Sequence, residues 1–115
     1  MTIKHMNALS DFRSPPFDCR PAVQWSWNGE VDESGISQSL VDFAEKGVGG
    51  FFMHARPGFE LGYISEEWFA LWEHAASECK SAGMLWHIYD EYTCPGGHAG
   101  GHTVADASHV AGQEL

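Results

Sequence analysis

The sequence predicts an α/β protein: a partial (β/α)8 barrel of about three β/α units with a parallel sheet. Strand-like and helix-like patterns alternate along the chain as β-α-β-α-β, and loops with polar and aromatic residues follow the strands. Parallel neighbours in this order need right-handed crossovers, which the intervening helices supply. We expect residues 1–20 to form an irregular amino-terminal segment around Pro15 and Pro16. Residues 21–115 then form the amino-terminal portion of an incomplete barrel domain.

The first unit begins with residues 22–27 (AVQWSW), which alternate, are rich in strand formers and stop at the turn signal Asn28-Gly29. The apolar period then changes to that of a helix of about 13 residues. Asp32 or Ser34 can cap its start, and Gly47 supplies a left-handed stop. The residues on its apolar face are Ile36, Leu40, Phe43 and Ala44.

The second and third units repeat this order. Residues 48–54 (VGGFFMH) form a short apolar run typical of a parallel strand that is buried on both faces. After a glycine- and proline-containing loop, Ser65 starts a helix that Gly83 ends. Residues 84–89 (MLWHIY) are the third predicted strand, and a glycine-rich loop, CPGGHAGGH, follows them. Residues 103–115 carry only a faint helical pattern.

Composition narrows the function classes. Six Lys and Arg against sixteen Asp and Glu give a formal charge of -10, which repels nucleic acids and anionic membranes, so we expect neither as a partner. The three cysteines lack a C-x-x-C pair, so we expect reduced thiols. The first twelve residues contain no signal-peptide core, so we expect a cytoplasmic protein; secretion stays open if a leader lies upstream.

Ligands of parallel β/α proteins bind beyond the carboxyl ends of the strands, and this rule selects the candidate site residues. Trp faces stack on sugar rings, Asn and Arg bind hydroxyl groups, and paired acids supply proton transfer or stabilise an oxocarbenium ion. Asp90 and Glu91 are the candidate catalytic acids. The candidate substrate-binding residues are Trp27, Asn28, Glu30, His54, Arg56, Tyr89 and Tyr92.

Each candidate also has a purely structural interpretation. Trp25 and Trp27 share one face of their strand and could both be core residues. His54 could simply end a strand, and Asp90 and Glu91 could be solvated acids or helix caps. Because His98 and His102 are four residues apart they could bind zinc from one helix, but Gly100 and Gly101 between them disfavour that helix. We therefore expect no metal and no cofactor.

Four segments together resemble the large glycoside hydrolases of the α-L-rhamnosidase-like family. These segments are PAVQWSWNGE at 21–30, GVGGFFMHARPG at 47–58, YISEEW at 63–68 and GMLWHIYDEYTCPGGHAGG at 83–101. The resemblance implies a (β/α)8 catalytic barrel followed by β-sandwich domains, with Asp90 and Glu91 as active-site acids. Relatives carry Asp, Arg and Trp where this chain has Tyr92, Thr93 and Cys94, so an Asp-Arg pair and a Trp of the family are missing here.

The sequence therefore predicts a fragment of a glycoside hydrolase that cleaves a glycosidic bond, on an α-L-rhamnoside or a related sugar. Three strands cannot close a barrel, so we expect the chain alone to be inactive and to need the missing strands and β-sandwich domains of its parent protein. Two alternatives remain open. One is a non-catalytic carbohydrate-binding or interaction module, and the other is a metal-dependent hydrolase on the same kind of barrel.

Overall fold

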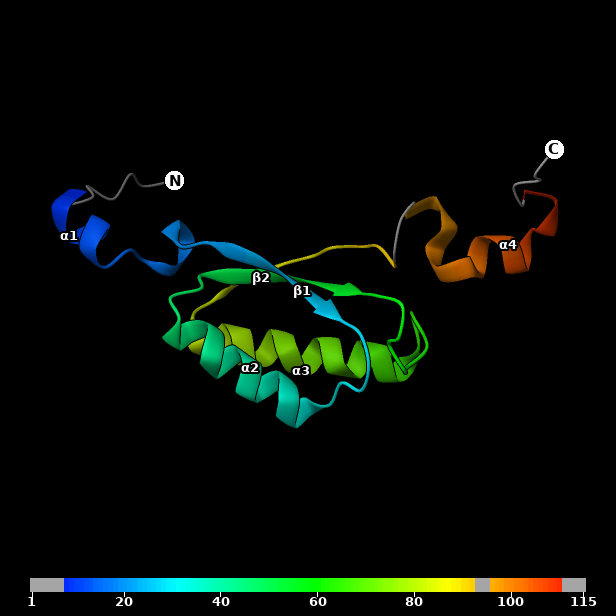
Figure 1. The fold of residues 1–115 in the computed structure, drawn as a ribbon, viewed down its shortest axis with the longest axis horizontal. Coiled ribbons are helices and arrows are strands. Elements are labelled where there is room, and N and C mark those ends of the chain that lie inside the picture. The colour runs from blue at the N-terminus through cyan, green and yellow to red at the C-terminus, as the bar shows by residue number, and fades with distance from the viewer. Residues whose placement is uncertain (1–7, 93–95, 111–115) are drawn as a thin grey trace.

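The computed structural model describes residues 8–92 and 96–110 and has the α/β class that the sequence predicts. Its centre is a three-stranded parallel sheet in the order β1-β2-β3. Figure 1 shows α2 and α3 side by side on one face of this sheet. The bounds are β1 Ala22–Trp27, α2 Glu33–Glu45, β2 Gly50–Ala55, α3 Glu66–Ala82 and β3 Leu85–His87. The arrangement is compatible with a partial β/α barrel.

Helix ends form at the residues that the sequence indicates. The Asp32 side chain accepts a hydrogen bond from the Gly35 amide at 2.7 Å, and the Ser65 hydroxyl accepts one from the Trp68 amide at 3.2 Å. Each cap pairs an amide that a helix start leaves without an intrahelical partner. Gly83 ends α3 with φ 71°, a left-handed conformation that favours glycine. The capped helices α2 and α3 connect β1 to β2 and β2 to β3, so their ends set where the chain leaves and re-enters the sheet.

The core lies between the sheet and the two helices. Alternate residues of β1 and β2 point into it, and the register places Trp25 beside Met53 and Trp27 beside Ala55. The Trp25 ring lies 5.1 Å from the ring of Phe51, which has no exposed surface. Helix residues complete this core: Ile36 and Leu40 from α2, and Trp68, Leu71, Ala75 and Cys79 from α3.

The third strand is shorter than predicted. Residues 84–89 were expected to form it, but β3 contains only Leu85–His87, paired with Gly50–Phe52 of β2. Beyond His87 the chain continues without ladder pairing until Tyr92 makes one parallel bridge to Ala55. The apolar run at 84–89 shows that these residues suit a strand. The length of the strand also depends on how many of them find hydrogen-bond partners on the neighbouring strand.

The amino-terminal segment is more regular than predicted. Residues 1–20 were expected to be irregular, yet α1 spans Ala8–Arg13 and a 3-10 turn, η1, spans Phe17–Cys19. Phe17 packs against the core beside Gly83, at the end of the sheet where the strands begin, and its ring lies 4.3 Å from the Arg20 guanidinium. Figure 1 shows α1 beyond that end of the sheet.

The chain after the third strand extends past the other end of the sheet. There the structure has η2 (Gly96–Gly101), α4 (His102–Asp106) and η3 (Ser108–Val110), so the faint helical pattern yields one short helix and a turn. No helix within residues 8–92 and 96–110 is long and apolar enough to span a bilayer. Cys19 and Cys79 form no disulfide within the described residues, and Cys94 lies outside them.

Candidate functional site

All three strands end at one edge of the sheet. Trp27, the last residue of β1, pairs with Ala55, the last residue of β2, and the Arg56 amide donates to the Trp27 carbonyl at 2.9 Å. The bridge between Ala55 and Tyr92 places the segment after β3 beside the ends of β1 and β2. The loops after β1 and β2 are also joined, because the Gly29 amide donates to the Gly58 carbonyl at 2.7 Å. The segments that carry the candidate residues therefore share one rim.

The face of the sheet opposite α2 and α3 carries a separate set of side chains, which we call the barrel-side face. It consists of Gln24 and Ser26 from β1, Phe52 and His54 from β2, and Tyr89 after β3. These residues alternate with the core residues of their strands. The Tyr89 ring lies 5.5 Å from that of Phe52 and 4.8 Å from that of His54. Figure 1 shows neither long helix on this face.

His54 is the most buried polar residue of the barrel-side face, with 2% of its surface exposed. Its Nδ1 lies 2.7 Å from the amide nitrogen of Gln24, whereas its buried Nε2 has no hydrogen-bond partner in the described part of the chain. Burial lowers the pKa of His54 below its ordinary value of 6.5, and the Arg56 guanidinium lowers it further. The Glu91 carboxylate opposes this shift. A neutral imidazole at neutral pH follows.

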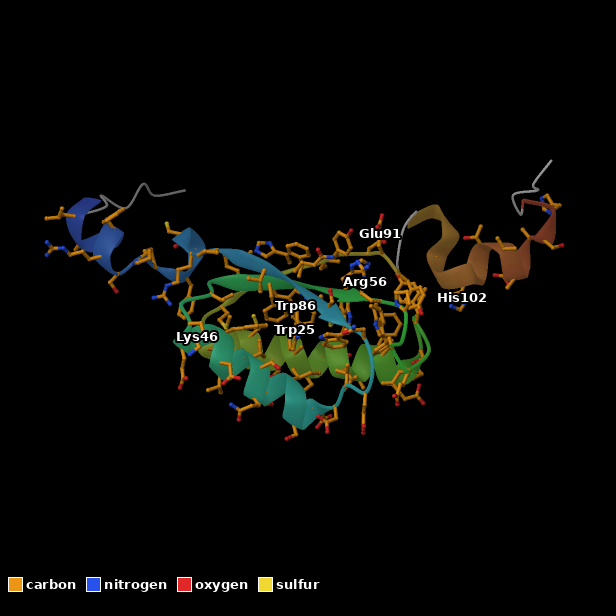
Figure 2. The ribbon with its side chains drawn as sticks, in the orientation of Figure 1. Trp25, Lys46, Arg56, Trp86, Glu91 and His102 are labelled. Carbon is orange, nitrogen blue, oxygen red and sulfur yellow. The ribbon has the colours of Figure 1, made fainter. Side chains whose placement is uncertain are left out.

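Glu91 contacts Tyr89 and lies at the same end of the sheet as Arg56. The Tyr89 hydroxyl donates a hydrogen bond to Glu91 Oε2 at 3.3 Å. Figure 2 shows Arg56 and Glu91 at the same end of the sheet, away from the helices. Both residues shift the pKa of His54, in opposite directions. The sequence-predicted residues His54, Arg56, Tyr89 and Glu91 are thus brought together.

Asp90 and Tyr92 face the loop that follows β2. Asp90 is exposed, and the Tyr92 ring lies 5.1 Å from the ring of Tyr63. Burial raises the pKa of Tyr63, and the negative charges of Asp90 and Glu91 raise it further, because a phenolate beside carboxylates is disfavoured. Both acids therefore act on this part of the rim.

Trp27 does not reach the barrel-side face. Its ring points toward the helices, has 1% of its surface exposed and packs against Trp25 at 5.6 Å and Phe59 at 6.1 Å. A sugar needs an open ring face, so the expected stacking role of Trp27 is not supported and its core interpretation holds. The reason is the alternation along β1, which places Trp25 and Trp27 on the helix side together.

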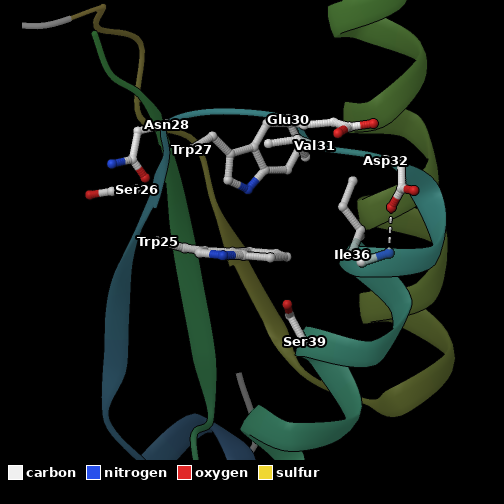
Figure 3. A pocket seen from close by; sticks show the side chains of 10 residues that line it. Trp25, Ser26, Trp27, Asn28, Glu30, Val31, Asp32, Ile36 and Ser39 are labelled. Atoms are coloured by element: carbon white, nitrogen blue, oxygen red, sulfur yellow. Dashed lines mark hydrogen bonds between the residues drawn. The ribbon is translucent and has the colours of Figure 1, made fainter. Parts of the chain in front are cut away.

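Asn28 and Glu30 follow β1, and both are exposed. They line a hollow together with Trp25, Trp27 and residues of α2. In Figure 3 Asn28 and Ser26 point away from the helices, whereas Glu30 lies on the loop that leads to the Asp32 cap. Asn28 therefore remains near the barrel-side face, and Glu30 does not join it.

Sequence reasoning missed two residues of this region. Gln24 holds His54, and the strand alternation that placed Trp25 and Trp27 together could have placed Gln24 opposite them. Tyr63 contacts Tyr92 across the rim, and no local pattern marks it. Its position depends on how two loops pack.

His98 and His102, whose spacing was weighed for zinc and disfavoured, do not share an α-helix. α4 begins at His102, and the preceding turn contains Ala99 at φ 45° and Gly100 at φ 64°. His102 Nε2 donates instead to the Tyr63 carbonyl at 3.2 Å, and nothing is described of the His98 side chain. Within the described ranges, no three His, Cys, Asp or Glu residues lie close enough to hold a metal ion.

Comparison with known proteins finds a relative among glycoside hydrolases. The chain is 35% identical over 82 residues to a protein of Formosa agariphila named "Putative beta-glucuronidase". The match covers 65% of this chain and only 7% of that protein. No protein-family model matches the chain, and no solved structure matches it. The similarity supports a glycoside hydrolase type of function at most, and it does not single out the α-L-rhamnosidase-like family.

Proposed function

We propose that this chain supplies three β/α units of a glycoside hydrolase barrel and contributes carboxylates to the cleavage of a glycosidic bond. The observation that carries the proposal is the convergence of His54, Arg56, Tyr89 and Glu91 at one rim, on the sheet face that neither long helix covers. In closed β/α barrels this face becomes the interior, and the carboxyl ends of the strands become the active-site mouth.

The residues at this rim are suited to sugar chemistry. Glycosidases use two carboxyl groups, one of which protonates the leaving oxygen while the other activates water or attacks the sugar. Glu91 and Asp90 are the candidates for one of these groups. Arg56, Asn28 and Tyr92 can bind sugar hydroxyls. His54 is buried on the same face of the sheet and packs against Tyr89. We propose that the second carboxyl group comes from a later strand of the parent barrel.

The resemblance of the sequence to the α-L-rhamnosidase-like family suggests an α-L-rhamnoside as the substrate. Arg56 suggests a second candidate substrate, a uronide. An arginine binds a carboxylate with two parallel hydrogen bonds, and a uronic acid carries such a carboxylate where rhamnose has a methyl group. The name of the Formosa protein points to a uronide as well. Under the uronide alternative, Arg56→Gln raises KM for an aryl glucuronide by about 10-fold or more. A rise of the same size in KM for an aryl rhamnoside would instead assign Arg56 to hydroxyl groups and contradict the uronide alternative.

The partners of the chain in this proposal are a carbohydrate substrate and the remaining barrel strands. The groove between β3 and α3 supports the second partner, because it is lined by Phe69, Trp72, Ala76, Trp86 and Ile88, and Ile88 is 77% exposed. The indole nitrogens of Trp72 and Trp86 are buried there without a hydrogen-bond partner among the described residues. Another β/α unit would cover this groove. Cytoplasmic location and the β-sandwich domains stay predictions.

The test uses the complete barrel protein with Asp90→Asn and Glu91→Gln combined. Under the enzyme proposal, the double variant loses at least about 100-fold in kcat on the glycoside that the wild type hydrolyses, while sugar affinity measured by calorimetry is kept. Glu60→Gln is a matched control, since it removes an exposed acid of the loop after β2. Unchanged turnover would contradict the proposal, and binding without any turnover in the wild type would favour the binding-module alternative.

A further inference from the structure

A chain of side-chain contacts on the barrel-side face runs from β1 across β2 to the segment after β3 and ends at Glu91. Gln24 of β1 lies 2.7 Å from Nδ1 of His54 on β2. The His54 ring lies edge-on to the Tyr89 ring with 4.8 Å between their centroids and an interplanar angle of 66°. The Tyr89 hydroxyl then donates to Glu91 Oε2 at 3.3 Å. The first two links join residues that are distant in sequence, and the last joins two residues of the segment after β3.

The first link determines the tautomer of His54. Turned over, the Gln24 amide would accept from an Nδ1–H; as the structure has it, the amide nitrogen faces the ring and donates, so Nδ1 accepts. In a neutral imidazole the single proton then resides on Nε2. The ring is held in one orientation as well, because it is 98% buried between β1 and Tyr89. A fixed ring gives Tyr89 a fixed surface to pack on.

We propose that Gln24 is a positioning residue: it holds His54 in the neutral Nε2–H form and, through the His54–Tyr89 contact, directs the Tyr89 hydroxyl toward Glu91. The importance of this direction for cleavage rests on the proposed function. The contact chain itself does not, because it concerns only groups within the 115-residue chain. Arg56 and Glu91 are the charged groups that act on His54, and Phe52 also packs against Tyr89.

The test is nuclear magnetic resonance of the full chain with ¹⁵N-labelled histidine and ring-¹³C-labelled tyrosine, at concentrations below self-association. In the wild type we expect a protonated Nε2 and a bare Nδ1 for His54, assigned by their loss in His54→Gln. Gln24→Glu places a carboxylate beside Nδ1, so the proton moves to Nδ1 and the His54 titration moves to higher pH. Gln24→Leu leaves Nδ1 without a donor, so both tautomers become populated. In both variants the Tyr89 ring resonances shift.

Two controls separate this role from general loss of structure. Gln38→Glu makes the same change of charge on α2, where Gln38 bonds Asp42, and leaves the signals of His54 and Tyr89 in place. Tyr89→Phe keeps the ring contact and removes the hydroxyl, so the His54 tautomer stays the same. A protonated Nδ1 in the wild type would overturn the proposal, as would Tyr89 signals that ignore both Gln24 variants. Absence of glycosidase activity would leave these spectra unchanged and would affect only the proposed function.

Discussion

The groove between β3 and α3 predicts that the isolated chain associates with itself. Its lining is apolar apart from Glu73, and the outer edge of β3 pairs with no strand in the described residues. Open strand edges beside apolar side chains promote pairing with another chain. We therefore expect the isolated chain to bind an apolar dye and to form dimers or larger species.

Two side chains provide the magnitude. Phe69 is 43% exposed and Ile88 is 77% exposed. A phenylalanine has about 150–250 Å² to bury, so covering the exposed part of Phe69 stabilises an interface by about 2 kcal/mol at about 25 cal/mol per Å². Covering Ile88 adds about 1–2 kcal/mol. Combining Phe69→Glu with Ile88→Lys removes about 3 kcal/mol or more, which weakens association roughly 100-fold.

Sedimentation velocity over a concentration series measures this change, with dye fluorescence as a second readout. Val41→Glu is the matched control, because Val41 is 52% exposed on α2 and does not line the groove. We expect the double variant to be monomeric at concentrations where the wild type and Val41→Glu associate. A monomeric wild-type chain that unfolds cooperatively and binds no dye would refute the reasoning, and with it the proposal of an incomplete barrel.

Three further predictions concern the core, the pH response and the sheet. Trp27→Ala lowers the free energy of unfolding in urea by about 3–5 kcal/mol, whereas a sugar platform would lose only sugar affinity. The pKa of His54 is lowered in the folded chain, so its contribution to stability is complete above pH 6.5 and declines as the pH falls below that value, because the unfolded chain takes up the proton first. His54→Gln therefore flattens the dependence of Tm on pH in this range. A variant with the same dependence as the wild type would argue against the shift. A Cβ on Gly50 would lie 2.6 Å from the Leu85 carbonyl oxygen, so Gly50→Ala loosens β3 and lowers the free energy of unfolding by about 1–3 kcal/mol, measured by thermal unfolding. Gly97→Ala is the control, because a Cβ on Gly97 meets open space. A loss no larger than that of the control would count against the pairing of β2 with β3.

Local chemistry made most of the fold predictable from sequence. The alternation of residues 22–27 gave β1 its observed bounds, and the Asp32 cap with the 3.6-residue period gave α2. Gly83 ended α3 as expected, since its left-handed conformation is a property of the residue itself. The third strand was overestimated because its length depends on pairing with distant residues, and α1 was missed because Pro15 and Pro16 dominated that segment.

The site was less predictable than the fold. Chain order and the rule for strand ends selected His54, Arg56, Tyr89 and Glu91, which the structure brings together. The same rule selected Trp27, because it identifies the end of a strand and not the face on which a side chain lies. Tyr63 depends on loop packing, which no pattern in one sequence reports.

The central claim is that three successive β/α crossovers bring their following residues to one rim. Nuclear Overhauser contacts from the Tyr92 ring of the isolated chain test it most directly. We expect contacts with Ala55 and with the Tyr63 ring, whose centroid lies 5.1 Å away. Contacts of Tyr92 with Phe17, at the opposite end of the sheet, would contradict the arrangement on which the glycosidase proposal depends.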